Sequence, residues 1–433
     1  SRYSYVGINP NKILVHRYGQ TFITENSNTT ETDKPFLDVL RESQAEYDIA
    51  KLPGIPAFTG GLVGYLGYET IVWTENIPIH DESVLGVPDA VFMLFEDIIA
   101  FDHLKGSAVF ISNVNIDLNC DLKTQFDSAH ARIDQMGEML HSDIDFQVPS
   151  RVTKSQLSSN FEPESFESAV LKAKDYIRNG DIYQVVLSQR FNRQTTVEPV
   201  TIYRALRTIN PSPYMFHLKL KEFDIIGASP ELLVKVDDGI VEVRPIAGTR
   251  LHGESEVENK AIAQDLMNDE KECAEHLMLV DLGRNDVGRV SEFGSVILPE
   301  YKLIENFSHV MHIVSGVKGK LSADKDPFDA LMSGFPAGTV TGAPKLRAME
   351  IIHELEQDRR DIYSGAVGFF DLAGNMNTCI AIRTMVMKDQ TVYFQSGAGI
   401  VHDSDPAKEY EETINKAKAI MAAIDFAENG LVN

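Results

Sequence analysis

The sequence is poor in cysteine and contains no long apolar run. Three cysteines, Cys120, Cys273 and Cys379, are spread over 433 residues, without the C-x-x-C spacing of a metal or redox site and without the even number of a disulfide framework. No stretch of about 18 apolar residues could span a bilayer, and the N-terminal residues lack the apolar segment of a signal peptide. We therefore expect reduced cysteines, no membrane partner and a cytoplasmic location.

The sequence also has few positive charges. It contains 40 Lys and Arg against 64 Asp and Glu, for a formal net charge of −24. Proteins bind the phosphate backbone of nucleic acids through clusters of basic residues, so DNA and RNA are excluded as partners. An acidic chain can still bind an anionic small molecule where a metal ion and a few basic groups reverse the potential locally.

The chain divides into two regions joined by a polar connector. In residues 1–145, aromatic and β-branched runs such as 90–95 and 108–111 predict strands. The connector extends from about Ser142 to Asn160, and we place the boundary near residue 150. Residues 160–425 predict an α+β or α/β domain, with strands at 225–228, 232–236 and 240–243 and helices near 257–280, 344–357 and 406–423.

Two predicted helices far apart in the sequence each carry two carboxylates three residues apart. Glu272 and Glu275 lie in a helix predicted to end at Val280, and Glu409 and Glu412 lie in the last helix, followed by Lys416. Residues at this spacing share one helix face, and Mg²⁺ prefers oxygen ligands. Two interpretations stay open, a magnesium site or solvated faces that form surface ion pairs.

Two glycine-containing segments can bring backbone amides to a ligand. The segment 335–345 has three residues between its glycines and lacks Gly-Lys-Ser/Thr, which excludes a Walker-type phosphate loop. It predicts a turn that opens a helix at Pro344, where free N–H groups can bind a carboxylate. Gly397-Ala398-Gly399 ends a predicted strand and permits close approach of a ligand. Each segment is equally compatible with a structural turn.

Taken together, several motifs resemble those of the chorismate-utilising enzymes, most closely the large subunit of anthranilate synthase. They are Pro245-Ile246-Ala247-Gly248-Thr249-Arg250, Asp281-Leu282-Gly283-Arg284-Asn285-Asp286, His309-Val310-Met311-His312, the turn from Gly338 to Lys345, and Ile380-Ala381-Ile382-Arg383-Thr384. The resemblance is strong over residues 160–425 and weaker over 1–145. It implies an α+β fold with large β-sheets in a sandwich and helices packed outside. It further implies a Mg²⁺-dependent lyase of tryptophan biosynthesis that forms anthranilate and pyruvate from chorismate and ammonia.

The resemblance also implies roles for individual residues. Glu275 and Glu412 match the Mg²⁺-binding glutamates of the family. Glu231 matches the general acid that protonates the departing ring hydroxyl, a role that needs a raised pKa. His312, which the apolar pattern alone leaves as either a half-buried or a catalytic histidine, and Thr339 match positions of the later step that releases pyruvate. The substrate-binding positions are Gly248, Thr249, Tyr363, Arg383, Gly397, Ala398, Gly399 and Lys416.

Two positions discriminate within the family. Gln184 stands where members that add water have a lysine base, which implies that ammonia is the nucleophile. Ala247 stands where aminodeoxychorismate synthases typically have a nucleophilic lysine, which favours anthranilate synthase. The alternatives are an aminodeoxychorismate or aminodeoxyisochorismate synthase and, from another class, a non-catalytic sensor of chorismate or tryptophan.

The resemblance implies a partner and an inhibitor as well. None of the cysteines has the Gly-x-Cys-x-Gly context of a glutaminase, so a separate glutamine amidotransferase subunit, component II, is expected to supply ammonia. Tryptophan is expected to inhibit through Pro213, Tyr214 and Met215, with a contribution from the N-terminal region. The family's Leu-Leu-Glu-Ser element, which belongs to this regulatory site, normally precedes a segment like Arg2-Tyr3-Ser4-Tyr5. We therefore expect the N-terminal region to be incomplete at its start.

Overall fold

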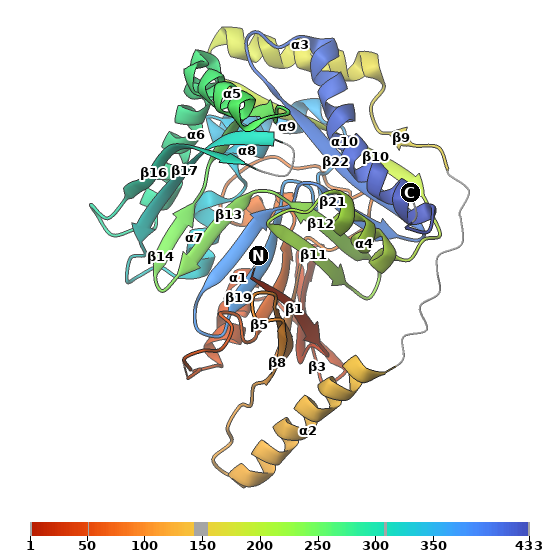
Figure 1. Cartoon of the computed structure of the whole chain (residues 1–433), viewed down its shortest axis with the longest axis vertical. Helices are drawn as coiled ribbons and strands as arrows, with labels where there is room; N and C mark the ends of the chain where they lie inside the picture. The colour runs from red at the N-terminus through yellow and green to blue at the C-terminus, as the bar shows by residue number, and fades with distance from the viewer. Residues whose placement is uncertain (1, 51, 143–154, 307–309, 432–433) are drawn as a thin grey trace. The chain divides into compact units, whose positions relative to one another are not determined.

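The computed structural model describes residues 2–50, 52–142, 155–306 and 310–431 (Figure 1). These residues form two compact units. The first comprises the chain up to Leu66, residues 88–142 and Val367–Asn377; the second comprises Gly67–Val87, the described residues between 155 and 366, and the chain from Thr378 onward. The units therefore do not follow chain order, and the boundary predicted near residue 150 lies outside the described residues.

The first unit contains two sets of antiparallel strands. One set has the order β1-β7-β8, and α2 (Leu122–His141) packs on β8. The other has the order β19-β5-β6-β2-β3-β4, with α1 (Phe36–Ala45) against β2 and β5. The strands are β1 (Tyr3–Ile8), β2 (Lys12–Arg17), β3 (Gln20–Glu25), β4 (Asn28–Thr32), β5 (Gly61–Leu66), β6 (Ala90–Phe95), β7 (Asp97–Asp102), β8 (Ser107–Ser112) and β19 (Ala366–Asp371). The strands predicted at 90–95 and 108–111 are thus confirmed.

The second unit also contains two sets of antiparallel strands. The chain returns to this unit along β20 (Met376–Ile380) and then remains in it. One set has the order β11-β12-β21-β22-β10-β18, with β9 (Ser158–Ser159) paired to β10. Its strands are β10 (Gln184–Gln194), β11 (Tyr214–Lys219), β12 (Asp224–Ser229), β18 (Gly342–Ala343), β21 (Thr384–Lys388) and β22 (Thr391–Ile400). The other has the order β15-β17-β14-β13, with β16 paired to β17. Its strands are β13 (Leu232–Asp237), β14 (Ile240–Val243), β15 (Ile246–Leu251), β16 (Ile297–Asn306) and β17 (Val310–Lys320).

Helices of the second unit bury their apolar faces against these strands. α3 (Pro163–Asn179), α9 (Lys345–Leu355) and the short α8 (Gly338–Thr341) pack on β10, while α4 (Pro199–Ile209) packs on β12 and α10 (Pro406–Glu428) packs on β22. α7 (Pro327–Gly334) packs on β13, and the 3₁₀ segment η1 covers Tyr68–Trp73. Along α10, Ala417 is fully buried, and Tyr410, Ile414 and Met421 pack on the apolar clusters, so one stripe of this helix faces the core. The predicted α+β class is confirmed.

The predicted helix near 257–280 consists of two helices, α5 (Glu256–Asn268) and α6 (Glu270–Gly288). Asp269 separates them because its side chain accepts hydrogen bonds from the N–H groups of Lys271 and Glu272, at 3.0 and 3.1 Å, and so caps α6. The predicted end at Val280 is wrong, since α6 continues for two more turns. Its buried face continues through Gly283, where a Cβ would lie 3.0 Å from Val243. Of the charged residues in this segment, Asp281 and Arg284 are exposed, whereas Asp286 is buried and pairs with Lys345 at 3.0 Å.

None of the helices among the described residues is both long enough and apolar enough to cross a membrane.

A buried guanidinium joins several of these elements. The Arg360 side chain donates to both carboxylate oxygens of Glu356, at 2.6 and 2.8 Å, and to the carbonyl oxygens of Val340 and Val186, both at 2.7 Å. Its Cζ lies 4.9 Å from the ring centroid of Tyr68 and 5.6 Å from that of Tyr363. α8, β10 and the segment after α9 therefore meet at one ion pair.

Replacing Arg360 by methionine should lower the free energy of unfolding by about 3–5 kcal/mol, because the buried Glu356 carboxylate would lose its counter-ion. Urea unfolding followed by circular dichroism measures this change. The control is Arg178→Met, which removes an exposed ion pair with Asp175 at 2.9 Å and should cost less than about 1 kcal/mol. Equal losses in the two variants would contradict the structural role of Arg360.

Candidate active site

All predicted site residues lie in the second unit, and several gather along the last part of β22. This strand pairs with β21 over Thr391–Phe394 and with β10 over Thr391–Ile400. Residues 395–400 therefore extend past the end of β21, and the backbone groups on that side are not used by the β21 ladder. Backbone amides at such an edge can bind a ligand.

The glycines of this overhanging segment lie under polar side chains. A Cβ at Gly397 would lie 2.9 Å from the Tyr363 hydroxyl oxygen, and a Cβ at Gly399 would lie 2.7 Å from the Gln184 amide nitrogen. The Lys416 ammonium donates to the Gly397 carbonyl oxygen at 2.8 Å. Because a Cβ at Gly397 would also lie 2.8 Å from the Leu187 carbonyl oxygen, glycine is needed there, whereas a larger residue at position 399 would displace the Gln184 amide. The structure thus brings Gln184, Tyr363 and Lys416 together on the segment 397–399.

The carboxylates predicted on two helices also meet here. The Gln184 amide donates to Glu275 of α6 at 3.4 Å, and Lys416 pairs with Glu412 of α10 at 2.7 Å. Burial raises the pKa of Glu275, and the nearby carboxylates of Glu272 and Glu412 raise this pKa further. The faces predicted on α6 and α10 therefore lie close enough for their charges to interact.

Within the part of the chain that the structure describes, no three His, Cys, Asp or Glu side chains are grouped as metal ligands. Mg²⁺ nevertheless needs only one or two carboxylates, because it keeps several waters and shares ligands with its substrate. A divalent cation would also relieve the repulsion that raises the pKa of Glu275. The oxygen donors of Glu275 and Glu412 therefore fit Mg²⁺.

A carboxyl group with a raised pKa lies at the turn between β12 and β13. Burial raises the pKa of Glu231 to about 7, while Thr339, Arg383 and Lys416 act in the opposite direction. Ile380 donates its N–H to the Glu231 carbonyl oxygen and Ala228 donates to that of Arg383, both at 3.1 Å. These backbone bonds fix the two loops side by side. Near pH 7 the Glu231 carboxyl can therefore exist in both protonation states, as an acid catalyst requires.

Thr339 is placed beside Glu231 by a tight approach of α8 to β10. Gly342 has φ 137°, and a Cβ there would lie 2.1 Å from the Gln184 carbonyl oxygen, while a Cβ at Gly338 would lie 2.0 Å from Leu282. The Thr339 hydroxyl lowers the pKa of Glu231 but makes no hydrogen bond of regular geometry to the described residues. This hydroxyl is therefore available to a substrate.

The backbone is strained near two of the predicted substrate-binding residues. Arg383 has φ 49°, and Asp361 and Ser364, on either side of Tyr363, have φ 51° and 64°. Residues other than glycine rarely adopt this left-handed region, and strained residues of this kind are frequent at functional sites. The Arg383 side chain is exposed, yet its pKa is lowered because surrounding protein atoms reduce its solvation.

His312 lies opposite a bulge in β15. The pairing of β15 with β17 shifts between Ala247 and Thr249, at Gly248, whose φ is 70°. The His312 Nδ1 lies 2.8 Å from the Gly248 carbonyl oxygen and 3.1 Å from the Thr249 hydroxyl. Because the carbonyl only accepts, Nδ1 carries the proton, and Nε2 of the neutral ring has the lone pair. Burial lowers the pKa of His312, so the ring is neutral near pH 7.

The residues predicted to bind an inhibitor lie at the start of β11. Tyr214 pairs with Ser229 and Met215 with Ala228 of β12, the strand that leads to Glu231. Met215 packs on the apolar cluster of α4 and α10, and Pro213 is exposed. A tryptophan site at Pro213–Met215 stays a prediction.

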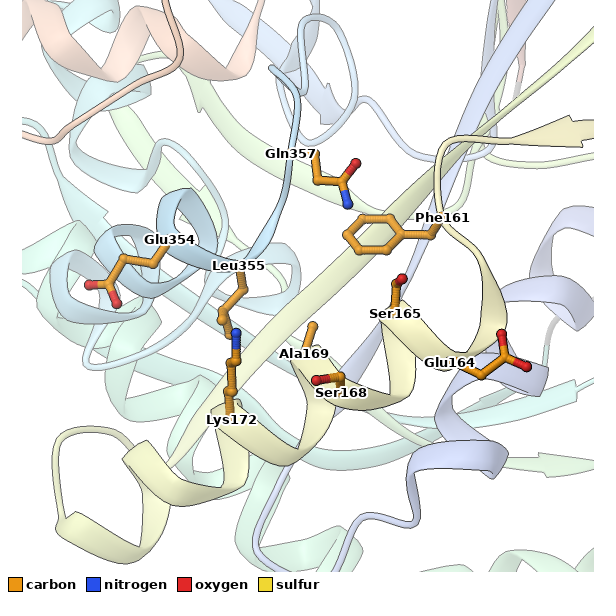
Figure 2. A pocket seen from close by; sticks show the side chains of 9 residues that line it. All are labelled: Phe161, Glu164, Ser165, Ser168, Ala169, Lys172, Glu354, Leu355 and Gln357. Atoms are coloured by element: carbon orange, nitrogen blue, oxygen red, sulfur yellow. The ribbon is translucent and has the colours of Figure 1, made fainter.

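Figure 2 shows a separate recess of about 370 Å³, lined by side chains of α3 and of the end of α9, among them Lys172 and Glu354. It contains none of the predicted site residues, and its lining is largely exposed. The recess is therefore not the candidate site.

Sequence reasoning missed the buried network of Glu356 and Arg360 and the contacts of Arg250. The run from Glu356 to Asp361 is highly charged and follows a helix, which is typical of an exposed turn, but Glu356, Arg360 and Asp361 are buried. A possible signal was the position of this run immediately before Tyr363, since charges next to a ligand-binding residue often organise it.

Comparison with known proteins identifies the family of this chain. The family model described as "chorismate binding enzyme" matches residues 2–422. Anthranilate synthase component 1 of Acetivibrio thermocellus is 47% identical, covering 99% of this chain and 88% of the relative; that of Cereibacter sphaeroides is 44% identical, covering 98% and 87%. The crystal structure of anthranilate synthase component I from Streptococcus pneumoniae TIGR4 is 40% identical, with a TM-score of 0.87, and covers 97% of this chain and 92% of its own. With a family match over almost its whole length and relatives this similar, the chain belongs to the chorismate-binding enzymes, within the anthranilate synthase component 1 family.

Proposed function

We propose that this chain is the aminating subunit of an anthranilate synthase, which converts chorismate and ammonia into anthranilate and pyruvate. The observation that carries the amination is the position of Gln184, between Glu275 and Gly399. A glutamine amide cannot take a proton from water at neutral pH. Ammonia already has a nucleophilic lone pair and needs no such base, so this site favours ammonia.

Substrate binding uses the few positive groups of an acidic chain. Arg383, Lys416, the Tyr363 hydroxyl and the amides of Gly397, Ala398 and Gly399 would bind the enolpyruvyl carboxylate, while Gly248 and Thr249 contact the ring. The planar guanidinium suits a carboxylate because it can donate two parallel hydrogen bonds. Glu275 and Glu412 would hold Mg²⁺, which when bound neutralises and orients the ring carboxylate.

In the first step, ammonia forms a bond to the ring and the ring hydroxyl departs. The Glu231 carboxyl donates the proton with which the hydroxyl leaves as water, and the new ammonium group later loses one proton. Glu231 suits this role because burial raises its pKa to about 7. Thr339, beside this carboxyl, can orient the leaving group or the intermediate.

In the second step, the amino intermediate loses pyruvate and becomes aromatic. The ring carbon that bears the nitrogen loses a proton, the bond between the neighbouring ring carbon and the enolpyruvyl oxygen breaks, and the departing enolate takes up a proton to become pyruvate. The neutral His312 ring can accept this proton at Nε2, because Nδ1–H is held by the Gly248 carbonyl oxygen.

An aminodeoxychorismate or aminodeoxyisochorismate synthase would share the amination but stop before pyruvate is lost by this route. The buried methyl group of Ala247 cannot act as the nucleophilic lysine of the former. A non-catalytic sensor would need neither an acid near pH 7 nor an oriented imidazole. We further propose that a glutamine amidotransferase subunit supplies the ammonia and that tryptophan inhibits at Pro213–Met215.

The first test is anthranilate fluorescence with the purified chain, chorismate and Mg²⁺. Anthranilate should form with an ammonium salt and not with glutamine alone, because the glutaminase is a separate subunit, and EDTA should abolish it. Chorismate consumed without anthranilate would favour an aminodeoxychorismate-type product. If chorismate is not consumed, the chain does not catalyse the amination that we propose.

The variant Glu231→Gln should lower the rate of chorismate consumption by about 10²- to 10⁴-fold, since the amide cannot donate the proton. In the unsubstituted chain, at a fixed concentration of free ammonia, the rate should fall as the pH rises through about 7, where the carboxyl loses its proton. The residual rate of the variant should lack this decrease. The same decrease in both proteins would remove Glu231 as the acid.

The variant His312→Met should allow amination to continue while the amino intermediate accumulates, because the proton acceptor of the elimination is lost. Chromatography of quenched reactions gives the ratio of anthranilate formed to chorismate consumed. This ratio should fall well below that of the unsubstituted chain. An unchanged ratio would exclude His312 from the elimination.

A further inference from the structure

Arg250, the last residue of the motif that contains Gly248 and Thr249, makes an unusual set of contacts at the start of α6. Its guanidinium donates to Asp269 at 2.7 Å, to Glu272 at 3.2 Å and to Asp265 at 3.3 Å. It also donates to the Thr249 carbonyl oxygen at 3.1 Å. One side chain of β15 is thus bound to the end of α5 and to the first turn of α6.

These contacts fix the first turn of α6 from two directions. Asp269 is also the N-cap of α6, since it accepts the N–H groups of Lys271 and Glu272. The second carboxylate oxygen of Glu272 lies 3.2 Å from the place that a Cβ at Gly248 would occupy. Glu272 therefore lies between the Arg250 guanidinium and the β15 bulge, and α6 cannot rotate about its axis without breaking contacts on both sides.

The same turn of helix orients a proposed metal ligand. Glu275 follows Glu272 by three residues and lies on the same face of α6, where its charge interacts with that of Glu412 on α10. On the other side of the bulge, the Gly248 carbonyl oxygen holds Nδ1 of His312. Arg250 therefore holds the turn of α6 that leads to Glu275, and it lies in the strand whose bulge orients His312. It forms no hydrogen bond with either of these two residues among those that the structure describes.

We propose that Arg250 is a positioning residue that couples the two halves of the site, by holding α6 so that Glu275 faces Glu412 while the Gly248 bulge orients His312. This inference rests on the proposed function, because it assigns Mg²⁺ to Glu275 and Glu412. Side chains that orient a metal ligand typically change metal affinity by about 10- to 100-fold when substituted. A role limited to general stability would leave the affinity unchanged.

The test compares Arg250→Lys with the unsubstituted chain by isothermal titration of Mg²⁺ in the absence of substrate. Lysine keeps the charge, so the local potential is preserved, but its three N–H donors lack the planar fork that reaches these acceptors. The dissociation constant for Mg²⁺ should rise by about tenfold. The ratio of anthranilate formed to chorismate consumed should also fall, because His312 loses its fixed orientation.

Arg284→Lys is the matched control, since Arg284 lies on the same helix and forms an exposed pair with Asp281 at 2.9 Å. It should bind Mg²⁺ as the unsubstituted chain does. Urea unfolding of each protein shows whether it is folded. If Arg250→Lys does not fold, Asp265→Asn removes one exposed partner of Arg250 and should still raise the dissociation constant, by a smaller factor.

If the unsubstituted chain binds Mg²⁺ and Glu412→Gln does not, this result supports the metal assignment independently of Arg250. Given that result, an unchanged Mg²⁺ affinity in folded Arg250→Lys would overturn the role of Arg250 and leave the metal assignment in place. If Arg250→Lys does not fold, an unchanged affinity in Asp265→Asn has the same meaning. An unsubstituted chain that binds no Mg²⁺ would overturn the metal assignment, and the coupling proposed for Arg250 would fall with it.

Discussion

The candidate site depends on the buried ion pair of Arg360 with Glu356. A guanidinium that loses its water is stable only if its N–H groups are satisfied, and here the acceptors include carbonyl groups of β10 and α8. Val186 is two residues from Gln184, and Val340 is adjacent to Thr339. The ring of Tyr363 lies against the same guanidinium. The hydrogen-bonding needs of one buried cation therefore set the relative positions of three site residues.

The site also shows how an acidic chain can accommodate an anionic substrate. With a formal charge of −24, long-range attraction of an anion is excluded, and binding has to come from short-range groups. Arg383 and Lys416 supply local positive charge, and backbone amides of β22 add donors without adding charge. The proposed cation between α6 and α10 would complete the reversal of potential. Each contribution acts over a few ångströms, where solvent screening is weakest.

Much of this arrangement could be predicted from the sequence, because it rests on local patterns. The carboxylate spacing on α6 and α10, the apolar stripe of α10 and the strands before Glu231 follow from helix and strand periodicity. The length of α6 could not be predicted, since its continuation past Val280 depends on the fit of Gly283 against Val243. The contacts of Arg250 and Arg360 also escaped prediction, because they join residues whose pairing is decided only by tertiary packing.

The bulge at Gly248 makes the number of residues in β15 as important as their identity. In a regular strand, neighbouring side chains alternate between the two faces, and the added residue of a bulge inverts this alternation for the rest of the strand. Deleting one residue between Ile246 and Leu251 would therefore exchange the faces on which Thr249 and Arg250 lie. A substitution in this strand alters one contact at a time, whereas a change of length would separate α6 from His312 in a single event.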